Sequence, residues 1–129
     1  MQFELKLPLL GFESVSHMEL KKIDDVFMRL ESVGEGPSFT LISPFALREY
    51  SFDIPTSLQA LMEITPQSNL LIFNIMIVHT PIENSTINFV APLIFNTDNQ
   101  TMAQIIIDNR NDFGIAEPIK NYLQGSADA

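Results

Sequence analysis

Alternation of apolar and polar residues with a period of two is the feature that most constrains the fold of this chain. Near the N-terminus, Phe3, Leu5 and Leu7 alternate with polar residues, which is the pattern of a strand with one buried face. Further short segments follow along the chain and are separated by turn-forming residues. Some of them alternate in the same way, and others are nearly all apolar. We expect additional strands at residues 18–23, 26–31, 39–42, 47–54, 70–78, 86–90, 93–95 and 102–107.

Two segments change to the spacing of a helix. Leu58, Leu61 and Met62 predict a short helix over residues 56–64. Residues 115–123 predict a second helix near the C-terminus, with an apolar face that docks on the sheet. Strands therefore dominate, and helices are few and short.

Turns and one central strand complete the predicted organisation. Asp24 and Asp25, residues 33–37 and residues 96–99 are rich in residues that favour turns. Residues 70–78 are nearly all apolar and rich in β-branched side chains, so we expect a central strand that is covered on both faces. Residues 125–129 are expected to be a frayed tail.

These patterns predict an all-β fold with minor α. Many short strands with frequent turns are typical of an antiparallel barrel or sandwich. We expect a small antiparallel β-barrel-like domain with one or two short helices, including a C-terminal helix. The 129 residues, 46% of them hydrophobic, suit a single domain over residues 1–129.

Composition excludes several classes of protein. The absence of Cys excludes disulfides, thiolate metal sites and a Cys nucleophile. The formal net charge of −9 disfavours binding to nucleic acid or to anionic membranes. That charge either confers solubility or attracts a basic protein. The N-terminal alternation does not resemble a signal peptide, and residues 70–78 are too short to span a bilayer, so we expect a cytoplasmic protein.

Signals for an enzyme are weak. His17 and His79 lie far apart and belong to no zinc-binding motif. The glycines at Gly34 and Gly36 flank an acidic residue and lack the lysine of a phosphate-binding loop. We therefore expect no catalytic residue, metal or cofactor. The alternative is a small-barrel enzyme or ligand carrier in which His79 and neighbouring acids line a pocket.

Uncharged polar residues on apolar strands are the remaining feature. Asn74 interrupts an apolar run, and Asn88 and Asn96 lie on either side of Pro92. A proline within a strand pattern implies an edge or a bulge, because it cannot donate to the ladder. The asparagines either bond to a bulged backbone within the domain or lie at an edge that binds another chain.

The same region resembles the FliW family of bacterial flagellar assembly factors. Residues 86–96, Thr-Ile-Asn-Phe-Val-Ala-Pro-Leu-Ile-Phe-Asn, are similar to its signature Thr-Val-Asn-x-x-Ala-Pro-x-x-x-Asn. Other pieces that resemble the family follow in its order: Gly11-Phe12-Glu13, residues 27–32, 39–44 and 50–54, and Ala103-Gln104. The resemblance covers nearly the whole chain.

The resemblance implies a cytoplasmic, non-enzymatic protein with a small β-barrel-like fold. Members of the family bind flagellin before export and also bind CsrA, a small basic regulator that blocks translation of flagellin mRNA. Free protein then sequesters CsrA and relieves this repression. A flagellin-only export chaperone is the alternative within the same class.

We predict that partners bind at an acidic surface along a strand edge. Tyr50 would be its aromatic anchor, since tyrosine is enriched at interface hot spots. The candidate partner-binding residues are Glu49, Tyr50, Asp53, Glu83, Asn88 and Asn96.

Overall fold

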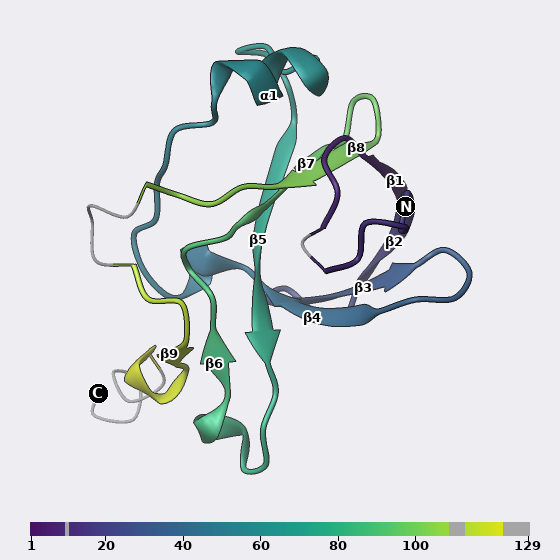
Figure 1. Cartoon of the computed structure of the whole chain (residues 1–129). Helices are drawn as coiled ribbons and strands as arrows, with labels where there is room; N and C mark the ends of the chain where they lie inside the picture. Colours follow the sequence, from purple (N-terminus) through teal and green to yellow (C-terminus); the bar gives the residue numbers. More distant parts are fainter. Residues whose placement is uncertain (10, 109–112, 123–129) are drawn as a thin grey trace.

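The computed structural model describes residues 1–9, 11–108 and 113–122 (Figure 1). Within these residues the helical elements are α1 (Thr56–Leu61) and two 3₁₀ turns, η1 (Pro44–Ala46) and η2 (Ile82–Asn84). The strands are β1 (Gln2–Leu5), β2 (His17–Lys22), β3 (Phe27–Ser32), β4 (Ser38–Ile42), β5 (Leu70–Ile77), β6 (Thr86–Ile87), β7 (Leu93–Asn96), β8 (Thr101–Gln104) and β9 (Glu117–Pro118).

Seven of these strands form a closed barrel. The order is β4-β3-β2-β1-β8-β7-β5, and β5 pairs back with β4 (Figure 1). Every pairing in the ring is antiparallel except that of β1 with β8, which is parallel. Closure leaves these strands without a free lateral edge. The predicted barrel is thus confirmed. Of the two structures that Pro92 implied, an edge or a bulge, the closed ring of strands leaves the bulge.

Alternate side chains of each strand point into or out of the barrel. The inward side chains form one buried cluster with Leu9, which follows β1. The cluster consists of Phe3, Leu9, Met18, Leu20, Leu30, Leu41, Leu93, Phe95 and Met102. Phe95 makes edge-to-face contacts with Phe3 and Phe73, at ring-centroid distances of 5.0 and 6.0 Å. The period of two in the sequence is therefore the period of this core.

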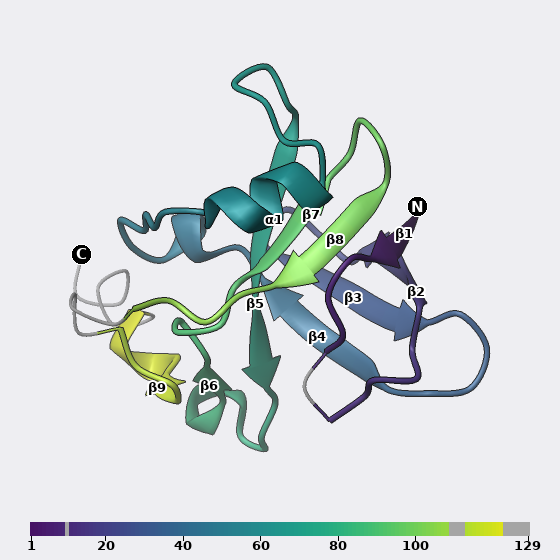
Figure 2. The same cartoon turned by 45° about the horizontal axis from the view of Figure 1, so that its top comes forward.

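The outer face of β5, β7 and β8 is covered by the chain that connects β4 to β5. Helix α1 lies across β7 and β8 (Figure 2), where Leu58 and Met62 pack on Ile94 and Ala103. The segment before it, residues 47–55, packs on a second outer cluster through Tyr50 and Phe52. This explains why β7 is buried on both faces. On β5, alternate residues likewise contact different clusters, although Leu71 and Ile77 are exposed.

The strand expected at residues 47–54 is not formed. The alternation predicted burial correctly, because Tyr50 is buried and Phe52 is half-buried, while Glu49 and Asp53 are exposed. The backbone, however, pairs with no strand. β5 already pairs with β4 along one side and with β6 and β7 along the other, so this segment lies across the outer face of the barrel.

The C-terminal helix begins later than predicted. The two residues of β9 pair with β6, and a helical turn follows at residues 120–122. Ile119 is buried, whereas Ile115 is 72% exposed. The pairing satisfies backbone N–H and C=O groups of β6. A helix at residues 117–118 would leave these groups of β6 unpaired. The predicted residues 123 and 125–129 lie outside the described part of the chain, in which no helix is long and apolar enough to cross a membrane.

The turns form where they were expected. Between β2 and β3, the Asp24 carboxylate accepts hydrogen bonds of 2.8 Å from the backbone N–H groups of Val26 and Phe27. The bond from Phe27, followed by that from Val26, lowers the pKa of Asp24 below its usual value. Between β7 and β8, the Asn96 side chain accepts a bond of 3.0 Å from the Asp98 N–H.

Core and surface leucines of the barrel should differ in their contribution to stability. Leu41 on β4 is fully buried, whereas Leu71 on β5 is 39% exposed. We expect Leu41→Ala to lower the free energy of unfolding by about 2–5 kcal/mol, the usual cost of such a cavity. Leu71→Ala should cost less than about half of that. Urea unfolding of both variants measures the difference. Equal losses of unfolding free energy would contradict the placement of Leu41 inside the barrel and of Leu71 on its surface.

Candidate partner-binding surface

The signature segment forms a wide bulge between β6 and β7. Ile87 pairs with Met76 and Leu93 pairs with Phe73, so the five residues 88–92 stand opposite only two residues of β5. Within this bulge the Asn88 N–H still donates to the Ile75 carbonyl at 3.0 Å. The carbonyl groups of Asn88 and Phe89 are left for side chains to bond. Pro92 thus marks a bulge, one of the two structures that a proline in this position implied.

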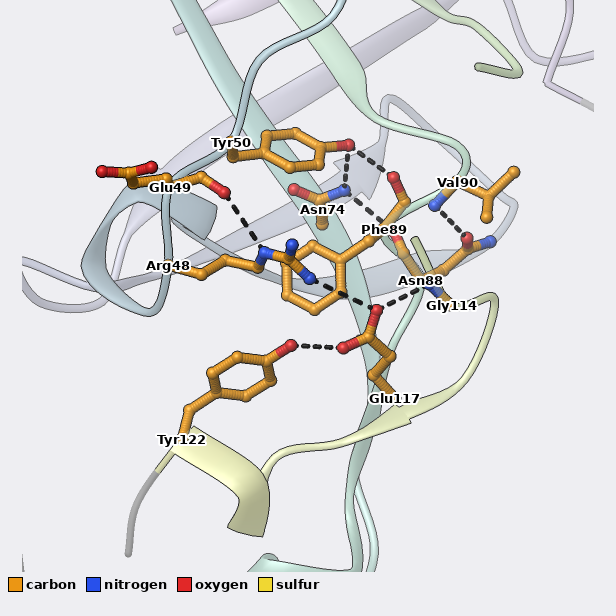
Figure 3. Close-up of polar contacts among 10 residues, drawn as sticks. All are labelled: Arg48, Glu49, Tyr50, Asn74, Asn88, Phe89, Val90, Gly114, Glu117 and Tyr122. Carbon is orange, nitrogen blue, oxygen red and sulfur yellow. Dashed lines mark hydrogen bonds and ion pairs between the residues drawn. The ribbon is translucent and has the colours of Figure 1, made fainter. Parts of the chain in front are cut away.

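Two buried side chains bond to these carbonyls (Figure 3). The Asn74 side chain is completely buried, and its Nδ2 donates to the Asn88 carbonyl at 2.9 Å and to the Tyr50 hydroxyl at 3.2 Å. The Tyr50 hydroxyl donates in turn to the Phe89 carbonyl at 2.5 Å. The Asn88 Oδ1 accepts a bond of 3.0 Å from the Val90 N–H. The prediction that asparagines bond to a bulged backbone within the domain is thus confirmed for Asn74.

A second cluster holds the C-terminal segment against the bulge. The Arg48 guanidinium lies over the rings of Phe89 and Phe113, 5.5 and 4.8 Å from their centroids, and 3.6 Å from the Glu117 carboxylate. That carboxylate also accepts hydrogen bonds from the Gly114 N–H and the Tyr122 hydroxyl. Sequence analysis missed this cluster, because Arg48 and Glu117 are distant in the chain and share no motif.

The predicted partner-binding residues do not form one surface. Glu49 and Asp53 are exposed on the outer segment, residues 47–55, and Glu83 is exposed on η2. In Figure 1, η2 lies at the end of the molecule opposite α1. Asn88 is half-buried in the bulge.

Two of the candidates are internal. Tyr50 is only 8% exposed and Asn96 only 1%. Tyr50 bonds to the bulge, and Asn96 Nδ2 donates to the Met62 carbonyl at 3.1 Å, just after α1. Burial therefore prevents either side chain from serving as an exposed contact. The prediction for Tyr50 failed because a tyrosine that alternates with acids can equally be the buried member of the pattern.

His79 has a structural contact of the ordinary kind. Its backbone N–H donates to the Ser85 hydroxyl at 2.9 Å, and the side chain is exposed. Within the described residues, no three His, Cys, Asp or Glu side chains form a group that could hold a metal ion. Of the two cavities described below, neither has His79 among its lining residues.

Comparison with known proteins defines first the fold and then the family. The barrel superposes on the crystal structure of the flagellar assembly factor FliW with a TM-score of 0.84, covering 92% of this chain and 84% of that one. The two sequences are 23% identical, so this likeness concerns the fold. A closed barrel with this outer layer is thus a fold already known from a flagellar assembly factor.

Sequence comparison then assigns the family. The family model described as FliW protein matches residues 1–119. Flagellar assembly factor FliW of Sulfurimonas denitrificans is 52% identical over 125 residues, which are 96% of this chain and 99% of that protein. Flagellar assembly factor FliW 2 of Wolinella succinogenes is 48% identical over 130 residues, at coverages of 98% and 96%. The chain belongs to the FliW family.

The bulge should be sensitive to loss of the Asn74 amide. In Asn74→Ala the partly buried Asn88 carbonyl and the buried Tyr50 hydroxyl both lose a hydrogen-bond donor, which should cost about 2–4 kcal/mol of unfolding free energy. Asn84 is exposed on η2, so Asn84→Ala is a matched control expected to stay within about 0.5 kcal/mol of the parent. Chemical denaturation measures both, and a loss for Asn74→Ala no greater than the control would contradict the assigned role.

Both tyrosines should ionise at a higher pH in the folded protein than in the unfolded protein. Burial raises the pKa of Tyr50, and burial together with the Glu117 carboxylate raises that of Tyr122. The folded chain therefore holds the phenolic protons more tightly than the unfolded chain, where the pKa is about 10. We expect an ultraviolet titration of the native protein to have its midpoint above that of the unfolded protein.

Stability should change with pH in the corresponding direction. Because the folded pKa values are raised, the stabilisation is complete below about pH 10 and is lost as pH rises through them. Tyr122→Phe leaves Tyr50 as the only phenol and so isolates its titration. Coincident native and unfolded curves for that variant would show that the phenol is not held by the bulge.

Proposed function

We propose that this protein is a non-enzymatic binding protein of flagellar assembly that acts in the cytoplasm as one domain over residues 1–129. In this proposal it binds flagellin before export and binds CsrA, the basic regulator of flagellin translation. Membership of the FliW family, with a match along residues 1–119, is the observation that carries the proposal. The close relatives are named flagellar assembly factors.

The mechanism is competition for a limited pool of protein. A partner bound to this chain is removed from its other targets by mass action. CsrA held in this way cannot repress flagellin mRNA, and flagellin held in this way leaves less of the protein for CsrA. A stoichiometric binder needs a surface and no reactive side chain, which agrees with a chain whose conspicuous polar groups bond to its own backbone.

Charge supports a basic partner. The chain has 16 acidic residues and seven Lys or Arg. Glu49 and Asp53 are exposed on the outer segment, held in place because Tyr50 between them is buried. An acidic surface on a rigid support attracts a basic protein and accelerates its association. We therefore keep Glu49 and Asp53 as the proposed contact residues of the outer segment, with Asn88 in the bulge and Glu83 on η2 as separate candidate contacts.

Calorimetry with each partner tests this function. The protein is titrated with CsrA and with flagellin at low and at high salt. We expect binding to both, with the affinity for CsrA weakened by salt because exposed charges are screened. Binding to flagellin alone would support the narrower function of an export chaperone, and binding to neither would exclude the proposal.

Reversal of the two exposed acids should slow association with CsrA. The double variant Glu49→Lys, Asp53→Lys and the control Asp25→Lys, Glu35→Lys each change the formal net charge from −9 to −5. All four positions are exposed. If the outer segment receives CsrA, the first variant should associate about tenfold more slowly than the control in stopped-flow measurements at low salt. Equal rates would locate the interface elsewhere.

A further inference from the structure

Two isoleucines next to the bulge are the most exposed large apolar side chains in the described part of the chain. Ile106 is 68% exposed and Ile115 is 72% exposed. Both line one open groove of about 260 Å³, whose other apolar walls include Phe12. Exposed apolar side chains that gather around a hollow are typical of interaction sites.

The backbone holds Ile106 in this outward position. The N–H of Ile105 donates to the Pro92 carbonyl at 3.2 Å, and that of Ile107 donates to the Val90 carbonyl at 2.8 Å. Ile105 is 8% exposed in the cluster beneath α1. Since adjacent side chains of an extended segment point in opposite directions, Ile106 is directed outward. The groove is thus a fixed feature that the bulge itself creates.

Two amide side chains place polar groups in this apolar groove. Asn88 uses its Oδ1 to accept from Val90, as Figure 3 shows, and Gln104 uses its Nε2 to donate to the Ala91 carbonyl at 3.3 Å. Within the described residues, the Asn88 Nδ2 and the Gln104 Oε1 have no protein partner. The Asn88 NH₂ group can therefore donate to the carbonyl of a peptide group, and the Gln104 Oε1 can accept from its N–H.

Ile106 also borders a second cavity, and this one is acidic. The second cavity has a volume of about 280 Å³, and Asp53 and Asp108 are among its lining residues. Among the residues that the structure describes, no Lys or Arg lines either cavity. A segment that crosses Ile106 would therefore meet an apolar groove on one side and carboxylates on the other.

We propose that the groove binds an extended, basic segment of a partner protein. One apolar side chain of the segment packs against Ile106 and Ile115, and its peptide group bonds to Asn88 and Gln104. A neighbouring Lys or Arg pairs with Asp53. The inference rests on the proposed function only in taking the partner to be a protein.

Charge favours this occupant over two others. A second copy of the chain would bring a further net charge of −9 to the same acidic cavity, which repels it. Residues 123–129 contain Asp128 and no Lys or Arg, so they lack the cation that Asp53 requires. A basic segment from another protein can supply both an apolar side chain for the groove and a cation for Asp53.

Peptide titration followed by NMR tests the groove directly. The probe is acetylated Lys-Leu-Lys-Leu-Lys amide, added to ¹⁵N-labelled protein. We expect shifts at the side-chain amides of Asn88 and Gln104 and at the backbone of residues 105–107. Peptides with Glu in place of Lys, or Ser in place of Leu, should bind at least about tenfold more weakly. Shifts confined to another face, no shifts, or equal binding of the Glu peptide would overturn the proposal.

A matched pair of variants assigns the effect to Ile106. Ile106→Ser should weaken binding of the Lys-Leu peptide by about tenfold, because the exposed apolar contact is lost. Ile23 is 54% exposed and lines neither cavity, so Ile23→Ser should bind like the parent. Sedimentation of the parent protein without peptide should show a monomer, whereas a dimer broken by Ile106→Ser would make a second copy the occupant and overturn the proposal.

The same variants separate this inference from the proposed function. If the parent protein binds CsrA or flagellin and Ile106→Ser binds each equally tightly, the groove does not receive the partner, and the inference fails while the function stands. If the parent binds neither protein but the Lys-Leu peptide occupies the groove, the function fails while the inference stands.

Discussion

The fold depends on hydrogen bonds that two side chains make to the backbone of a bulge. β5 pairs with β6 at one end and with β7 at the other, and the five residues 88–92 stand opposite only two residues of β5. Part of this segment must therefore leave the ladder. The Phe89 carbonyl is buried and the Asn88 carbonyl is partly buried, and an unpaired carbonyl away from water costs free energy comparable to a lost hydrogen bond. Asn74 and Tyr50 supply the missing donors. With these bonds, β7 can continue to β8 and close the barrel while β6 diverges to receive β9.

Arg48 links the bulge to the outer layer and to the C-terminal segment. It lies over the Phe89 ring of the bulge and pairs with Glu117 beside β9. Its side chain is 30% exposed and that of Glu117 is 19% exposed, so water screens the pair only partly. Much of its contribution comes from packing of the guanidinium on the two rings, since an ion pair near the surface contributes little by itself. The outer segment is thereby fixed at Arg48, next to the exposed Glu49.

Local patterns predicted the strands, and long-range contacts decided the rest. The positions of β1 to β5 follow from alternation, from short apolar runs and from turn residues, all of which are local signals over a few positions. By contrast, Tyr50 lies 24 residues from Asn74 and 39 from Phe89, and nothing local relates them. The alternation at residues 47–54 gave the correct burial, but whether that segment pairs depends on β5 having partners already. Residues 105–107 are three consecutive isoleucines and show no alternation, so the outward direction of Ile106 could not be inferred.

Charge and shape have different roles on such a surface. Exposed acids such as Glu49 act over about 8 Å at physiological salt and mainly set the rate of encounter with a basic protein. They cannot distinguish one basic partner from another, because flexible charged side chains accept many geometries. Discrimination requires short-range contacts on a rigid support, and the bulge provides that support because its backbone is bonded to buried side chains. The polar residues of the signature segment thus act through the backbone geometry that they hold, and Asn88 alone among them combines that role with a place on the groove.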